Sequence, residues 1–309
     1  LSLILDDDDL AWCASGALTV LGQATDEERL AFEQKRQPTL RLRRDSLPED
    51  GFVQWILDDD ALGGVANIMA LLHQPLSNVL PMKRLSDLGL SNENRIDLQS
   101  RTLFSNMANA VSRILGLQLP PIYHAPGKAG IAKLPTSTPA LAVGDDVLNQ
   151  WRGRELRFAL GRAAVACAPG NELLGISDAK GIRLFIMAAL KMVFPDYQAP
   201  DDVKGIEEMG KGLAKHMSAA AMQDLKDVLT RFRQSNRPVD VQAFVMAVDR
   251  AATRTGLFLA NDIQIAAGVL QSDTLFLSEM EYGDHLVEMC AWSVSARYAN
   301  LRKVMLQPE

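Results

Sequence analysis

Helical periodicity is the feature that most constrains the fold, because it covers almost the whole chain after residue 178. Apolar side chains recur there at spacings of three and four residues, which places them on one face of an α-helix. Two helix starts are well marked, by Ser218 and by Pro238-Val239-Asp240. The pattern predicts helices over residues 178–193, 203–215, 218–234, 239–255, 260–271 and 282–301.

Helical segments are fewer in the first part of the chain. Runs of aspartate precede two of them, residues 10–21 and 61–72, and such carboxylates favour the positive end of a helix dipole. A third segment, residues 100–115, carries apolar residues on one face and is followed by Gly116, a typical helix stop. These signals predict three more helices.

Two short apolar runs, residues 122–124 and 140–144, predict strands before the helix over 155–167. Between them, residues 127–139 are rich in Gly, Pro, Ser and Thr, a composition typical of a loop. Alternation over residues 38–44 predicts another short strand. We therefore expect a mainly α fold, a multi-helix domain with a small β-hairpin or short sheet before the central helix.

The composition fits a folded protein, since 48% of the 309 residues are hydrophobic and 23% are charged. We expect an N-terminal helical region with a possible short strand over residues 1–82, and a helical module over 83–309. The formal net charge of -6 argues against nucleic acid as a partner. No apolar run reaches the roughly 18 residues that a membrane span requires.

The cysteines favour a reducing, cytoplasmic setting. Cys13, Cys167 and Cys290 are far apart, odd in number and without a Cys-x-x-Cys pair, so a disulfide framework is not expected. The chain begins at Leu1 without a methionine, which suggests a fragment of a longer polypeptide. A targeting signal could then lie upstream.

The helix over 155–167 has the rhythm of a zinc-protease helix but lacks its chemistry. In such a helix, two histidines at i and i+4 hold Zn²⁺ on one face, and a glutamate between them activates water. Here Arg162 stands at the first histidine, Ala163 at the glutamate and Ala166 at the second histidine. An arginine repels a dication and alanine offers no ligand, so we expect neither a metal nor another cofactor.

The order of strand, loop, strand and helix over residues 122–171 resembles the zincin core of the M48-like metallopeptidases. The front half of the helix carries the match, through Glu155, Leu156, Ala159, Leu160 and Gly161. This resemblance implies a degenerate zincin-like module. The alternative is an ordinary core helix made of alanines, whose likeness to that family is due to chance.

A second resemblance covers residues 83–301. This run is similar to an uncharacterised C-terminal module in large proteins of myxobacteria and their relatives, where it often follows TPR repeats. The matching stretches are residues 85–90, 139–144, 154–162, 250–259 and 293–298. The resemblance implies a bacterial scaffold beside helical repeats and does not imply a reaction.

Two other groups of polar residues are candidates for structural pairs. His285 and Glu288 have the i, i+3 spacing of half a carboxylate-bridged metal site, but a surface pair on a helix is the favoured interpretation. Gly256 is expected to break the helix around it. An ion pair from Arg250 or Arg254 to Asp262 would then join the two helices on either side.

The sequence therefore predicts a non-catalytic protein-interaction or scaffold module of a larger bacterial assembly. Its partner would be another protein, a helical-repeat region or an assembly subunit. The strand edge at Ile122, Tyr123 and His124 is the candidate peptide-binding site, because an exposed edge can accept an added strand. The alternative is a metallopeptidase-like hydrolase with an unrecognised site that uses Arg162 or His285.

Overall fold

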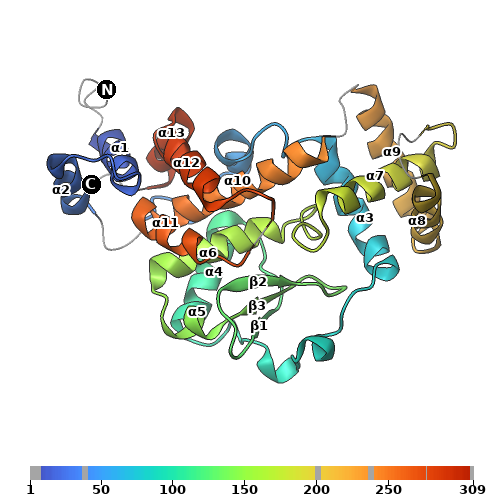
Figure 1. Ribbon diagram of the computed structural model, residues 1–309, viewed down its shortest axis with the longest axis horizontal. Coiled ribbons are helices and arrows are strands. Elements are labelled where there is room, and N and C mark those ends of the chain that lie inside the picture. The colour runs from blue at the N-terminus through green and yellow to red at the C-terminus, as the bar shows by residue number, and fades with distance from the viewer. Residues whose placement is uncertain (1–7, 37–40, 199–202, 236–239, 276, 307–309) are drawn as a thin grey trace.

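The protein is mainly α-helical with a small three-stranded sheet, which confirms the expected fold class. The computed structural model describes residues 8–36, 41–198, 203–235, 240–275 and 277–306. The helices are distributed along the long axis of the molecule (Figure 1). One end holds α1 (Asp8–Val20) and α2 (Asp26–Gln34), and the other holds α3 (Gly64–Val79), α7 (Ala179–Val193), α8 (Val203–Lys215) and α9 (Ala219–Gln234).

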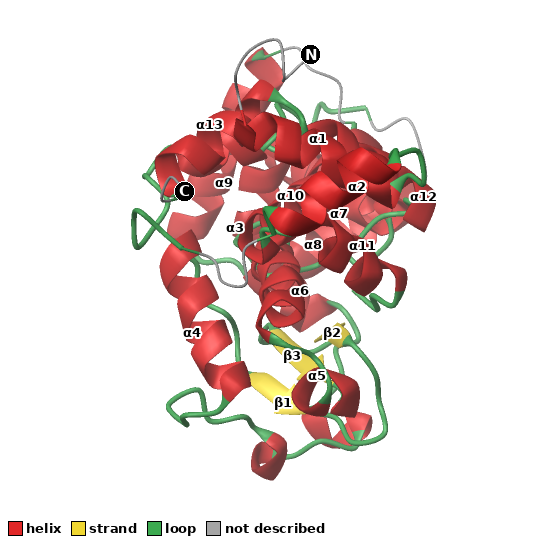
Figure 2. Ribbon diagram, turned by 90° about the vertical axis from the view of Figure 1, so that its left-hand side faces the viewer, coloured by secondary structure: helices red, strands yellow, loops and turns green. Residues whose placement is uncertain are grey.

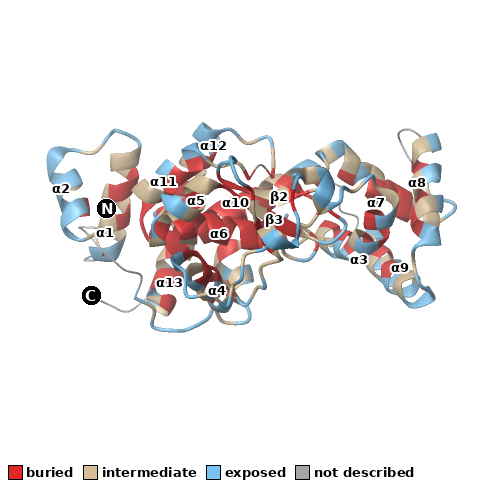
Figure 3. Cartoon of the chain, turned by 90° about the horizontal axis from the view of Figure 1, so that it is seen from below, coloured by how far each residue is buried: buried red, intermediate tan, exposed pale blue. Residues whose placement is uncertain are grey.

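The centre of the molecule is built on two crossing helices, α6 (Gly153–Ala166) and α10 (Val241–Ala260). Both are buried over most of their length (Figure 3). α10 begins where the Asp240 side chain accepts a hydrogen bond from the Ala243 N–H, and it ends at Asn261, which adopts the left-handed conformation. Around this pair lie α4 (Leu103–Leu115), α11 (Ile263–Gln271), α12 (Tyr282–Ser293) and α13 (Ala296–Met305).

Two glycines set the close approach of α6 and α10. A Cβ atom at Gly256 would lie 2.9 Å from the Phe158 carbonyl oxygen, and one at Gly161 would lie 3.3 Å from the Gly256 Cα. The predicted helix break at Gly256 is therefore wrong, since α10 continues to Ala260. Glycine is present there because α6 leaves no room for a side chain, and tertiary packing overrides its low helix propensity.

The sheet lies beneath α6 and beside α5 (Asp145–Asn149), as Figure 2 shows. It contains β1 (Ile122–His124), β2 (Ile131–Leu134) and β3 (Ala140–Val143) in the order β1-β3-β2. β1 runs parallel to β3, and β2 runs antiparallel to it. The two predicted strands thus form no hairpin with each other.

β2 lies within the stretch that the sequence predicts as a loop. Its four residues alternate too briefly to stand out from the glycines and prolines around them. Of the other predicted strand, residues 38–40 lie outside the described residues, and Leu42 forms an isolated bridge with Leu306. Short helical turns occur at η1 (Phe52–Ile56), η2 (Leu85–Leu88) and η3 (Asn92–Asn94).

Apart from the break at Gly256, most helix positions agree with the sequence expectation, with two further differences of substance. α2 was not predicted, although Thr25 and Glu28 form a capping box at its start. The segment predicted as one helix over 282–301 is divided into α12 and α13, because the Ser295 side chain accepts from the Tyr298 N–H and starts a new helix. As predicted, α4 ends at Gly116 in the left-handed conformation.

One continuous apolar core runs from Cys13 in α1 to Met305 in α13. Helices from both sides of residue 82 contribute to it, since α1 contacts α11 and α12 while α3 contacts α7, α8 and α9. A smaller cluster at the sheet consists of Leu90, Tyr123, Ala125, Leu134 and Ala140. Within the described ranges, every helix is too short or too polar to cross a lipid bilayer.

Candidate functional site

Arg162 lies inside the core, where only 2% of the residue is exposed. Its Nε donates to Asp273 at 2.6 Å and its Nη2 donates to Asp249 at 3.1 Å. The guanidinium also donates to the Thr253 hydroxyl and to the Leu275 carbonyl. The side chain therefore connects α6 to α10 and to the segment that follows α11, and two carboxylates neutralise its charge.

The other two positions of the missing zinc motif are packed into the same core. Ala163 and Ala166 are fully buried, so neither side chain faces solvent or a cleft. In the part of the chain that the structure describes, no three His, Cys, Asp or Glu side chains gather as a metal ion would require. These three positions of α6 therefore serve packing and charge neutralisation.

His285 is buried against α10 and is not a surface residue. Its Nδ1 lies 3.2 Å from the Thr253 hydroxyl, and its Nε2 lies 3.5 Å from Asp249. Glu288 pairs with Arg254 instead. The predicted surface pair is wrong because both residues lie on the face of α12 that packs on α10, and each finds a partner there.

Burial lowers the pKa of His285, although the nearby Asp249 carboxylate acts in the opposite direction. Burial likewise lowers the pKa of His73. In the window between these lowered values and the ordinary value near 6.5, the unfolded chain binds more protons than the folded protein. Stability is therefore complete above that window and decreases as the pH falls through it.

We expect the free energy of unfolding to fall as the pH is lowered below about 6.5, and to fall less steeply in the variant His285→Gln. Glutamine cannot become charged, so the variant loses the contribution of His285 to the slope. Urea denaturation at a series of pH values from about 5 to 8 would measure both slopes. Equal slopes in the two proteins would contradict the assignment to His285.

The ion pairs around α10 differ from those predicted. Arg250 and Arg254 both pair with Asp58, at 2.8 and 2.6 Å, and neither pairs with Asp262. Burial of Asp58 acts to raise its pKa, but the hydrogen bonds from the two arginines outweigh this effect and lower it. Because α10 continues through Gly256, its arginines are held away from the start of α11.

Asp262 caps α11 and is paired by residues from two other parts of the chain. Its side chain accepts from the Ile265 N–H, from Arg36 and from Arg154. Arg36 follows α2 in the chain, and Arg154 lies in the first turn of α6. The sequence identified Asp262 as a buried ion-pair residue, but not its partners.

The candidate peptide-binding edge is mostly covered. Only 1% of Ile122 and 7% of Tyr123 is exposed, and the half-buried His124 has its Nε2 2.7 Å from Asp145. On the side of β1 away from β3, the Ile96 N–H donates to the Ile122 carbonyl at 2.8 Å. An added strand would have to displace that contact, so peptide binding here stays a prediction.

Lys133 is a half-buried residue whose ammonium group is enclosed by backbone carbonyls, and no sequence motif indicates it. Its Nζ donates to the carbonyls of Ala166, Asn171 and Leu174, each at 2.8 Å. Burial lowers the pKa of Lys133 to about 8. The three bonds satisfy all the donors of an ammonium group, so this lysine joins β2 to the end of α6.

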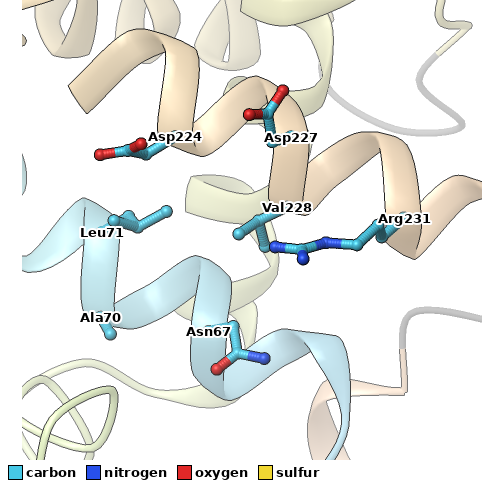
Figure 4. A pocket seen from close by; sticks show the side chains of 7 residues that line it. All are labelled: Asn67, Ala70, Leu71, Asp224, Asp227, Val228 and Arg231. Carbon is cyan, nitrogen blue, oxygen red and sulfur yellow. The ribbon is translucent and has the colours of Figure 1, made fainter. Parts of the chain in front are cut away.

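A groove of about 440 Å³ opens between α3 and α9 (Figure 4). Its apolar part consists of the half-buried Leu71 and Val228 with the exposed Ala70. The charged and polar lining residues, all exposed, are Asn67, Asp224, Asp227 and Arg231. The sequence predicts both helices but not their pairing, so the groove could not be found before the fold was known.

Comparison of the chain with protein-family models, with curated proteins and with solved structures finds no match. The zincin-like and TPR-associated resemblances therefore rest on the sequence stretches alone. What the fold and the sites define is a class: a mainly α-helical protein whose central helix carries a buried arginine and whose α3–α9 face carries an open groove.

Proposed function

We propose that this protein is a non-catalytic protein-interaction module that binds another protein in the groove between α3 and α9. The observation that carries the proposal is the groove itself, which combines an apolar floor with an exposed charged rim. Protein interfaces have this anatomy, with an apolar centre and a polar border. The partners we propose are a helical-repeat region or a subunit of a larger assembly.

The shape of the groove favours a protein partner over a small substrate. Small-molecule sites are concave and bury most of the ligand surface. This groove lies between two helices, and the charged and polar residues on its rim are exposed (Figure 4). A polypeptide segment can lay one face in such a groove and leave its opposite face in solvent.

The positions that would carry hydrolytic chemistry lack access to solvent. Arg162 is 2% exposed and His285 is 7% exposed, and both form hydrogen bonds within the core. Ala163 and Ala166 are buried beside them. This arrangement supports the interaction proposal over the alternative of a hydrolase that uses Arg162 or His285.

The test is a tryptophan placed in the groove. Ala70 is exposed and lines the channel, so Ala70→Trp fills it without altering the core. Ala291, an exposed alanine on α12, offers a matched control in Ala291→Trp. We expect a protein that co-purifies with the wild type from native lysate, and binds it again when purified, to be reduced at least tenfold by Ala70→Trp alone.

Unfolding curves would establish that both tryptophan variants keep the wild-type fold. Equal retention of the partner by the two variants would show that the groove is not the binding site. A wild-type chain that retains no protein in stoichiometric amount would contradict the proposed function as a whole.

The edge of β1, which the sequence indicates as a peptide-binding site, needs a different kind of variant. Ile122 and Tyr123 are buried, so a charged residue at either position would unfold the sheet before it tested binding. Only His124 is open enough to be replaced safely.

A further inference from the structure

We infer that the occupant of the α3–α9 groove is an amphipathic helix of a partner protein, with basic residues opposite Asp224 and Asp227 and an acidic residue opposite Arg231. This inference rests on the proposed function and specifies the chemistry of the partner. Its supports are the shape of the groove, the charges on its rim and the charge of the whole chain.

The shape of the groove follows from small residues on α3. At one end the two helices close on each other, since a Cβ atom at Gly64 would lie 2.4 Å from the Phe232 ring. One turn further along α3, the short side chains of Asn67 and Ala70 leave a channel whose floor is Leu71 and Val228 (Figure 4). A channel between two helices accepts the apolar face of a third helix.

The charges on the rim are free to bind a ligand. Among the residues that the structure describes, Asp224, Asp227 and Arg231 take part in no ion pair. Asp227 accepts one hydrogen bond, from the Gln223 amide at 2.9 Å, and keeps further acceptor capacity. The α3 wall adds no charge, because its lining residues are Asn67, Ala70 and Leu71.

The order of these charges along α9 sets the pattern that a partner must carry. Asp224 and Arg231 are seven residues apart, so they are separated by two turns, or about 10 Å, along the helix axis. A complementary helix therefore carries lysine or arginine about two turns from glutamate or aspartate. Opposite charges across an interface fix register and exclude partners of the wrong pattern.

The charge of the whole chain favours the same partner. The formal net charge is -6, so a helix that is basic overall is attracted before it docks. Two acidic residues on the rim disfavour an anionic membrane or a nucleic acid as the occupant. A second copy of this chain is an alternative occupant, and the experiment below separates it from the proposal.

The experiment is a selection from a phage-displayed library of helical peptides with leucines fixed on one face. It is run against the wild type and against the triple variant Asp224→Lys, Asp227→Lys, Arg231→Glu. All three positions are exposed, so the variant should fold as the wild type does. We expect the wild type to select basic residues two turns from acidic ones, and the variant to select the inverted pattern.

Fluorescence polarisation with the two consensus peptides then gives the affinities. We expect each peptide to bind its own target at least tenfold more tightly than the other, and Ala70→Trp to remove binding of the wild-type consensus. The same consensus from both targets, or no enrichment of helical peptides, would overturn the inference. So would a wild-type dimer that Ala70→Trp dissociates, since the occupant would then be a second copy.

The two proposals can fail separately. If Ala70→Trp releases the native partner but the selected charge pattern does not invert, the inference about the helix fails and the protein-interaction function remains. If Ala70→Trp has no effect on the native partner, the groove is not the binding site, and both the proposed function at this site and the inference about the helix fail.

Discussion

Arg162→Met is expected to lower the free energy of unfolding by about 3–5 kcal/mol, the usual cost of removing one partner from a buried ion pair. Methionine keeps an unbranched apolar stem, although it is shorter than arginine, and it carries no charge. It would leave Asp249 and Asp273 in the core without the guanidinium that now binds both of them. Urea denaturation of the wild type and the variant would measure the loss.

Arg29→Met is a matched control, because Arg29 pairs with Asp26 on the surface, where both side chains are largely exposed. We expect no measurable loss from it, since exposed pairs contribute little. Adding Asp249→Asn and Asp273→Asn to Arg162→Met should restore part of the stability by removing the unpaired charges. If Arg162→Met were as stable as Arg29→Met, the buried ion pair would make no net contribution to the free energy of unfolding.

The local signals in the sequence were sufficient for most of the secondary structure. Ser218 caps α9 as predicted, because its side chain accepts from the Ala221 N–H. The two apolar runs form β1 and β3, and the alanine-rich segment forms α6. Each of these features depends on residues that lie within a few positions of one another, so a single sequence can show them.

The contacts that define the candidate sites connect distant parts of the chain. Arg162 meets Asp249 and Asp273, which are 87 and 111 residues away. The sequence shows that Arg162 replaces a metal ligand, but it cannot show which residues neutralise the charge. For the same reason the α3–α9 groove stayed hidden, since it requires Leu71 and Val228 to lie side by side.

Gly256 shows how a correct local rule can give a wrong structure. Glycine has a low helix propensity, which favours a break, and the apolar residues after it could equally begin another helix. In the fold this position faces Phe158 across the α6–α10 crossing, where any side chain would collide. Glycine is therefore required at position 256 by the close approach of α6, and not by the helix α10 that contains it.

Gly256→Val is expected to lower the free energy of unfolding by about 3 kcal/mol, at the upper end of the cost of overpacking a core. A Cβ atom there would meet the Phe158 ring at 2.8 Å and the Phe158 carbonyl oxygen at 2.9 Å. The ring can rotate, but the carbonyl oxygen belongs to the backbone of α6. The collision can be relieved only if the two central helices move apart, which exposes apolar surface around them.

Gly268→Val provides the control, because Gly268 is also helical but is exposed and has open space where a Cβ atom would be added. Valine has a slightly higher helix propensity than glycine, so this variant should gain a few tenths of a kcal/mol. Thermal or urea denaturation would then show effects of opposite sign for one chemical change at two helical sites. Equal effects would mean that the α6–α10 crossing has room for a side chain and that the two helices are not closely packed at Gly256.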